Sequence, residues 1–188
     1  AKGQGIVIQG NTIRDHRTGV ADGSFLSAIM CARSGDVTIN ANVIADGYDS
    51  AMTIGGVAGG TQARNYSVTG NAFCTPKDNV PMLIIGQQDP SVDGFPDGVL
   101  VAANTFYTAT NGPAISLLSG KKVRISNNLL TSTITSGTTS GIRIDPLDET
   151  AGTATYTDDL VVEGNSIYMA TGGTKLPINI TGAEETGI

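Results

Sequence analysis

One eight-residue phrase recurs six times in this chain and restricts what the chain can fold into. The phrase reads apolar, any, apolar, any, small, asparagine, any, apolar, and its copies run over 6–13, 37–44, 66–73, 99–106, 123–130 and 160–167. The asparagines are Asn11, Asn42, Asn71, Asn104, Asn128 and Asn165, at spacings of 31, 29, 33, 24 and 37 residues. A phrase that returns at a period of roughly 20–50 residues indicates stacked repeats, each packed on its neighbours.

Within each copy the apolar residues alternate with period two, which indicates a strand rather than a helix. Counted from the asparagine, three positions are apolar in every copy. Position −5 holds Ile6, Val37, Tyr66, Val99, Val123 and Leu160; position −3 holds Ile8, Ile39, Val68, Val101, Ile125 and Val162; position +2 holds Ile13, Ile44, Phe73, Phe106, Leu130 and Ile167. No charged residue enters these columns, so each predicts a stack of side chains that lines one continuous core.

The asparagine interrupts this alternation, so the chain must bend there if positions −3 and +2 are both to face inward. Asparagine accepts the left-handed backbone more readily than most residues, and its amide can hydrogen-bond locally. We therefore expect the asparagine to turn the corner and the small residue before it to lie on the inside of the bend, with Asn127 as the exception. Asparagines in register are also expected to bond from repeat to repeat as a ladder.

A further short strand is expected between the phrases, at 27–31, 50–54, 81–85, 113–117, 141–144 and 177–180. Three short strands per repeat around an apolar stack predict an all-β fold, a parallel β-helix or single-stranded solenoid of about six coils spaced about 4.8 Å apart. A β-sandwich also has regularly spaced strands but does not usually repeat one asparagine corner. We expect one domain over 1–188. Because no capping helix is visible at either end, we expect either a segment of a longer solenoid or ends that other chains cover.

Composition and net charge restrict the kinds of partner that this chain can bind. Charged residues make up 15% of the chain and the net charge is −6, so binding to nucleic acid or an anionic membrane would gain little from counterion release. No apolar run approaches the roughly 18 residues of a membrane span. We expect neither kind of partner. The two cysteines, Cys31 and Cys74, are expected about two coils apart and therefore free.

The longest segments between strands, 86–98 and 145–159, are both acidic and are expected on one side of the rod, roughly 10 Å apart. Asp89 and Asp145 stand near their starts. Two carboxylates at such a distance suit an inverting glycosidase, which holds an acid, a base and one water. Arg143, expected to point outward beside Asp145, would orient an acidic or hydroxylated sugar. In the competing interpretation each aspartate, followed by proline, only starts a turn.

Two other loops carry candidate chemistry. In Asp46-Gly47-Tyr48-Asp49, Tyr48 would stack on a sugar while Asp46 and Asp49 bind it or serve as acid and base. In the competing interpretation the loop is only a turn, since Asp-Gly is a common turn dipeptide. In Asp15-His16-Arg17 a base stands beside a cation, as a lyase needs, although mutually paired surface charges would look the same. No metal-ligand spacing occurs, so we expect neither a metal nor another cofactor.

The repeated phrase V-x-I-x-G-N-x-I resembles the pectate-lyase-like right-handed β-helix superfamily over essentially the whole chain. That superfamily includes polysaccharide lyases, polygalacturonase-type hydrolases, alginate epimerases and the tailspikes of bacteriophages. Catalytic signatures of the first three are missing here: the only Asp-Asp pair is Asp158-Asp159, and Asp145-Pro146 is followed by Leu147 instead of histidine. The resemblance implies a right-handed coil, is greatest to tailspikes, and carries over no catalytic residue.

The resemblance to tailspikes implies a function and a setting. It implies a virion-tail or extracellular protein that binds and depolymerises a bacterial cell-surface polysaccharide, here by endo-acting hydrolysis, and that commonly forms a homotrimer of parallel rods. Apolar residues expected on an outward face, Val7, Leu100 and Val161, fit a side-by-side contact. Two alternatives stay open: a structural or adhesive rod without chemistry of its own, and a secreted polysaccharide lyase.

Overall fold

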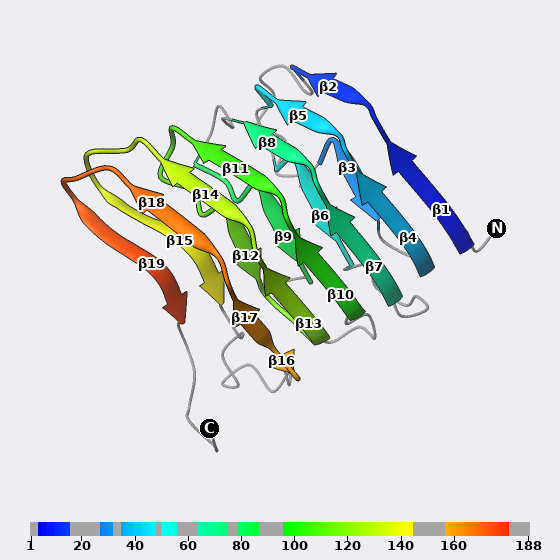
Figure 1. Ribbon diagram of the computed structural model, residues 1–188. Helices are drawn as coiled ribbons and strands as arrows, with labels where there is room; N and C mark the ends of the chain where they lie inside the picture. The colour runs from blue at the N-terminus through cyan, green and yellow to red at the C-terminus, as the bar shows by residue number, and fades with distance from the viewer. Residues whose placement is uncertain are drawn as a thin grey trace, which may run out of the picture.

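The computed structural model shows a parallel β-helix (Figure 1). It describes residues 4–15, 27–31, 35–47, 50–55, 64–74, 79–86, 96–144 and 157–180. Within these ranges the regular structure consists of strands that form three parallel sheets, here called A, B and C. Each of the six coils adds to the sheets in the order A, B, C, so strands far apart in sequence become neighbours. The predicted fold is confirmed.

Along the chain, successive strands belong to sheets A, B and C in turn. Sheet A contains β1 (Gln4–Gln9), β4 (Gly35–Asn40), β7 (Arg64–Thr69), β10 (Asp97–Ala102), β13 (Gly120–Ser126), β16 (Thr157–Asp158) and β17 (Val161–Glu163). Sheet B contains β2 (Thr12–Arg14), β5 (Val43–Ala45), β8 (Ala72–Cys74), β11 (Thr105–Thr108), β14 (Leu129–Ser132) and β18 (Ser166–Met169). Sheet C contains β3 (Ile29–Cys31), β6 (Met52–Ile54), β9 (Leu83–Ile85), β12 (Ile115–Leu117), β15 (Thr138–Ile144) and β19 (Thr174–Ile180). Both β16 and β17 pair with β13, so the last coil enters sheet A in two pieces.

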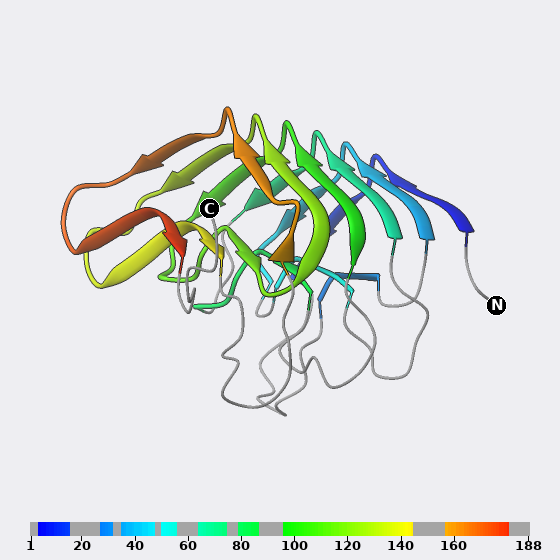
Figure 2. The same ribbon diagram turned by 90° about the horizontal axis from the view of Figure 1, so that it is seen from below.

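The coil is right-handed, as Figures 1 and 2 show together. In Figure 1 the near strands of sheets A and B rise and the far strands of sheet C descend, while the coils advance from the N-terminal to the C-terminal end. Figure 2 places sheets A and B above sheet C, on opposite sides of the core. This is the hand that parallel crossover connections almost always take, because of the right-handed twist of the strands.

The strand register confirms the three predicted core columns. In the −3 column, Ile39 pairs with Ile8 and Val68, and the column continues through Val101 and Ile125 to Val162. In the +2 column, the fully buried rings of Phe73 and Phe106 stack with their centroids 4.6 Å apart. Leu160, expected at −5, lies just before β17 and packs half-buried against the core. Burial of these columns on both sides of the asparagine holds the coils together.

The asparagine ladder is also confirmed, and it satisfies buried polar groups on three successive coils. The Asn71 side chain is 2% exposed. Its backbone N–H and its Nδ2 both donate to Oδ1 of Asn104, at 2.9 and 3.0 Å, and Nδ2 also donates to the Ile39 carbonyl at 2.9 Å. Asn42 donates to Asn71 Oδ1 in the same two ways. Because each amide is almost fully bonded, its burial costs little.

The expected geometry of the corner was wrong in one respect. The left-handed residue is the one before the asparagine, and it lies on the exposed outside of the bend while the asparagine side chain points inward. These residues, with φ between 52° and 70°, are Gly10, Ala41, Gly70, Ala103, Asn127 and Gly164. A small side chain is favoured there because a positive φ brings Cβ close to the following carbonyl oxygen. Space is not the reason at Gly10, where an added Cβ would meet nothing within 4 Å.

A second left-handed column occurs at position −6, which the sequence interpretation did not foresee. Its members are Gly5, Asp36, Asn65, Gly98, Lys122 and Asp159, with φ between 51° and 73°. The ladder skips this position, since Gln4 pairs with Gly35 and Ile6 with Val37. Each sheet A strand therefore carries a bend immediately before its first inward residue, and Figure 2 shows the resulting curvature.

Candidate functional site

The predicted acidic pair was expected beside the outer face of sheet C. Its outward column is Met30, Thr53, Ile84, Ser116, Arg143 and Asn179, as the sequence predicts. Thr53, Ile84 and Ser116 are buried despite pointing away from the core. Arg143 is exposed between the inward Ile142 and Ile144, so its predicted outward direction is confirmed.

The two predicted catalytic aspartates, Asp89 and Asp145, lie outside the described residues. The strands that precede them are described. Ile85 at the end of β9 and Ile144 at the end of β15 both pair with Leu117 of β12, between them. The two segments therefore begin at the same end of the sheet C strands. Their starting points lie two strands apart, about 9.6 Å. This is the spacing of the strand ends that the sequence predicts, and Arg143 lies one residue before the second of them.

Asp46 is the described member of the second candidate group, whereas Tyr48 and Asp49 lie outside the described residues. Asp46 follows β5 directly with a φ of 58°, and its backbone N–H donates to the Cys74 carbonyl at 3.3 Å. Its carboxylate lies 3.6 Å from the Arg14 guanidinium. These are features of a strand-ending turn held by a surface ion pair, so the structure brings Asp46 to Arg14 and Cys74 and far from Arg143 of the fifth coil.

Both cysteines are free thiols, as expected, and they face opposite ways. Cys31 points into the core, and burial raises the pKa of its thiol to about 11. Cys74 lies half-buried at an outward position of β8. Burial raises the pKa of the Cys74 thiol and the Asp46 carboxylate raises it further, while the Arg14 guanidinium lowers it. Raised pKa values leave both sulfurs mostly protonated at neutral pH, which makes them poor nucleophiles.

The third candidate group is described only in part. Asp15 takes a φ of 50° just beyond β2, and its N–H donates to the Ala45 carbonyl at 3.2 Å. His16 and Arg17 lie outside the described residues. The structure therefore places the backbone of Asp15 at the same point of the first coil that Asp46 occupies in the second.

The outer face of sheet B carries aromatic residues that the sequence interpretation did not single out. Tyr107 is 41% exposed and Tyr168 62% exposed, and Leu129 beside them is 40% exposed. Tyr107 and Tyr168 stand at position +3 of the fourth and sixth coils, and both pair with Thr131 of the fifth. Comparison of the +3 position in the six phrases would have found them, since that position is outward and only these two copies place an aromatic there.

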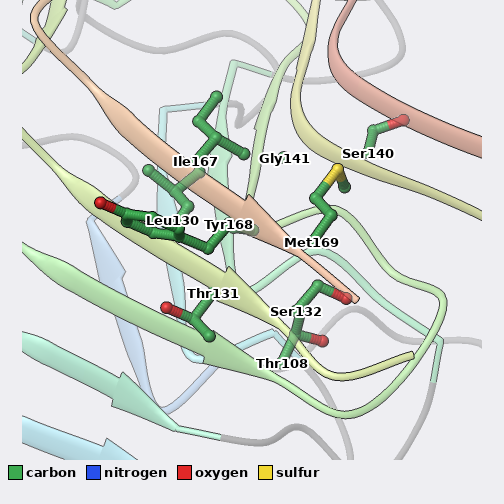
Figure 3. A pocket seen from close by; sticks show the side chains of 10 residues that line it. Thr108, Leu130, Thr131, Ser132, Ser140, Gly141, Ile167, Tyr168 and Met169 are labelled. Atoms are coloured by element: carbon green, nitrogen blue, oxygen red, sulfur yellow. The ribbon is translucent and has the colours of Figure 1, made fainter. Parts of the chain in front are cut away.

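A small hollow opens between sheets B and C in the last three coils (Figure 3). Leu130, Ile167 and Met169 line it from sheet B, and Ser140 and Gly141 line it from sheet C. Its free space, about 10 Å³, is that of a single water molecule. The hollow is therefore a packing gap that is too small for a sugar ring.

Neither a metal centre nor a spanning helix emerges from the residues that the structure describes. In those ranges no group of three or more His, Cys, Asp or Glu side chains comes together to hold a metal ion. The same ranges contain no helix that is long and apolar enough to cross a membrane.

Comparison with known proteins supplies no relative to guide the assignment. No family model, no curated protein and no solved structure matches this chain.

Proposed function

We propose that this chain is a rod that binds a bacterial cell-surface polysaccharide along its side. The observation that carries the proposal is the chemistry of the outward columns, at positions −4 and −2 of sheet A, +1 and +3 of sheet B and the centre of sheet C. Their charged members are Arg14, Arg124, Arg143 and Glu163, and Arg124 pairs with Glu163. The remaining side chains, mainly hydroxyl, amide, aromatic and small apolar groups, recur at intervals of about 4.8 Å. A ligand that itself repeats along its length fits such a surface.

The same proposal includes a setting taken from the resemblance to tailspikes. The chain would act in a virion tail or outside a cell, as a homotrimer of parallel rods. What supports side-by-side association is the outer face of sheet A, where Val7 is 64% and Val161 43% exposed in one outward column. Exposed aliphatic side chains of this kind gain free energy when a partner covers them.

We further propose that the rod cleaves its glycan by hydrolysis, with Asp89 and Asp145 as acid and base and Arg143 orienting the sugar. Support comes from the strand ends: β9 and β15 stop two strands apart, a distance at which two carboxylates can hold one water between them. Arg143 faces outward two residues before Asp145. Asp46, Tyr48 and Asp49 would bind a more distant part of the polymer.

The alternative is a rod that binds without chemistry, and one observation favours it. The outward column of sheet C, which would form the floor of the catalytic groove, holds no carboxylate in any of its six coils. In that case catalysis would have to come from elsewhere or be absent.

A two-part experiment tests the proposal. The chain is incubated with a panel of capsular and O-antigen polysaccharides, and binding is measured separately from the release of reducing ends. Asp145→Asn should keep the fold and the binding but abolish release, because the amide can neither give nor take the required proton. Asp97→Asn, which alters a carboxylate paired with Lys122 on sheet A at 3.7 Å, is the matched control and should leave release unchanged.

The outcomes separate the alternatives. Binding to no member of the panel contradicts the proposed function. Binding without release by the unaltered chain supports the non-catalytic rod, and unsaturated products that absorb in the ultraviolet support a lyase, with Asp15, His16 and Arg17 the first residues to test. Release that persists in Asp145→Asn removes Asp145 from the mechanism.

A further inference from the structure

The outer face of sheet B changes character halfway along the rod. The sheet B strip, as we call its last three coils, consists of the outward residues of β11, β14 and β18: Thr105, Tyr107, Leu129, Thr131, Ser166 and Tyr168. None of the six is charged. Figure 1 shows the three strands side by side, and the two tyrosines and Leu129 are all at least 40% exposed.

The first three coils show that the fold itself does not require this surface. There the +3 column holds Arg14, Ala45 and Cys74 in place of the aromatic residues. Ala45 is 4% exposed, and Arg14 pairs with Asp46. The same backbone position accepts a charge, a methyl group or a thiol, so the exposed rings of Tyr107 and Tyr168 are not needed for packing.

The spacing of the two rings is set by the strand register. Tyr107 pairs with Thr131 and Thr131 pairs with Tyr168, so the tyrosines stand two strands apart, about 9.6 Å. Figure 3 shows Thr131 beside Tyr168 on the neighbouring strand. Thr131 is short and half-buried, so no protruding side chain separates the two tyrosine rings. In an extended β-1→4-linked glycan, alternate sugars turn the same face toward a surface at about this separation.

The chemistry of the sheet B strip selects the kind of glycan. A pyranose ring offers a face of C–H groups that packs on an aromatic ring, and a rim of hydroxyls that bond to tyrosine, threonine and serine hydroxyls. An acidic polymer would bring charges to a face without cations, and burying unpaired charge is costly. We infer that the sheet B strip binds a neutral, linear polysaccharide that runs parallel to the rod axis, with Tyr107 and Tyr168 stacked on alternate sugars.

This inference rests on the proposed function and adds to it a binding surface on sheet B, apart from the catalytic groups proposed beside sheet C. Affinity electrophoresis through gels that contain a neutral β-1,4-linked polymer, hydroxyethylcellulose or galactomannan, tests it, with polygalacturonate and alginate as acidic counterparts. The unaltered chain should be retarded by a neutral polymer and pass freely through the acidic ones. Tyr107→Ala and Tyr168→Ala should each weaken retention about tenfold, the loss of one aromatic stack.

Two sets of controls separate stacking from folding. Tyr107→Phe and Tyr168→Phe keep the ring and should keep most of the affinity, whereas Met30→Ala removes an exposed apolar group from the first coil of sheet C and should change nothing. Circular dichroism of each variant checks that the coil is intact, which is expected because the altered side chains point away from the core.

Each remaining outcome contradicts the inference, and the outcomes also show which claim fails. If a neutral polymer retards the alanine variants as strongly as the unaltered chain, the sheet B strip is not the site although the rod binds glycans. Retardation by acidic polymers alone contradicts the assigned charge class in the same way. If none of these gels retards the chain, the inference fails, and the capsular panel decides separately on the proposed function. A change in sedimenting mass in the alanine variants assigns the strip to contact between chains instead.

Discussion

Inward and outward positions on the same strands differ in how closely the six coils resemble one another. At +2, facing the core, every coil places an aliphatic or phenylalanine side chain. One residue later, at +3, the column passes through Arg14, Ala45, Cys74, Tyr107, Thr131 and Tyr168. Stacking therefore constrains the inward columns and leaves the outward ones to other demands, because only inward side chains must match the coil above and below.

A change at an inward ring should have the largest effect. Phe106 is fully buried and stacked on Phe73, so Phe106→Ala removes a ring from the middle of the column and leaves a cavity. We expect the free energy of unfolding to fall by about 3–5 kcal/mol. Chemical denaturation followed by circular dichroism measures it. The exposed neighbour Thr105 supplies the control, since Thr105→Ala should cost well under about 1 kcal/mol. Equal losses from the two changes would show that inward and outward positions do not differ.

Breaking the asparagine ladder should come next. Asn71→Ala leaves the Asn42 backbone N–H, the Ile39 carbonyl and Oδ1 of Asn104 with fewer partners in a buried environment, since Asn104 Oδ1 keeps only the bond from the backbone N–H of residue 71. Unsatisfied groups of this kind cost about 2–3 kcal/mol in stability. Asn127→Ala is the matched control on the outside of a corner, where Ala41 and Ala103 already adopt the same backbone. A loss from Asn71→Ala no greater than that from the control would show that the ladder adds no stability.

The repeat made most of the fold predictable. Three apolar columns, the ladder and the third strand all followed from the phrase, because each recurs in every coil and only one stacking register satisfies them all. The residue that turns the corner was not identified, since Gly70 and the following Asn71 both tolerate a positive φ. The bend at position −6 could have been predicted from Gly5, Asn65 and Gly98, which are residue types that accept a positive φ. Lys122 at the same position of the fifth coil obscured this pattern.

The candidate site was far less predictable, for a physical reason. Asp89 and Asp145 lie in segments whose lengths differ from coil to coil, so no repeat restrains their conformation. The direction of Arg143 could be predicted because its strand repeats. Tyr107 and Tyr168 also lie on repeating strands, and their exposure follows from the same alternation. An outward column is thus as predictable in direction as an inward one, and its departures from a common residue type are the useful signal.

A smaller effect is expected when an inward and an outward residue of the same chemistry are compared. Cys74 should be alkylated by iodoacetamide faster than Cys31 in the folded protein, because Cys31 is buried in the core and the pKa of its thiol is about 11. The thiolate is the reactive form, so both rates should rise with pH, and Cys31 should stay protected at about pH 8. Mass spectrometry of the digested protein gives the two rates. Faster labelling of Cys31 would contradict the assigned directions of β3 and β8.

Asp46 allows a further test of the same comparison, because its charge affects the pKa of only the outward thiol, Cys74. The carboxylate raises the pKa of Cys74, so Asp46→Asn should lower that pKa, increase the thiolate fraction at a fixed pH below it, and speed alkylation of Cys74 by less than about tenfold. Cys31 should be unaffected, because burial alone raises its pKa. Asp36→Asn, which removes an equal charge from sheet A, should change neither rate. A slower reaction of Cys74 in Asp46→Asn would mean that the carboxylate acts on the sulfur through its ion pair with Arg14 and not through its own charge.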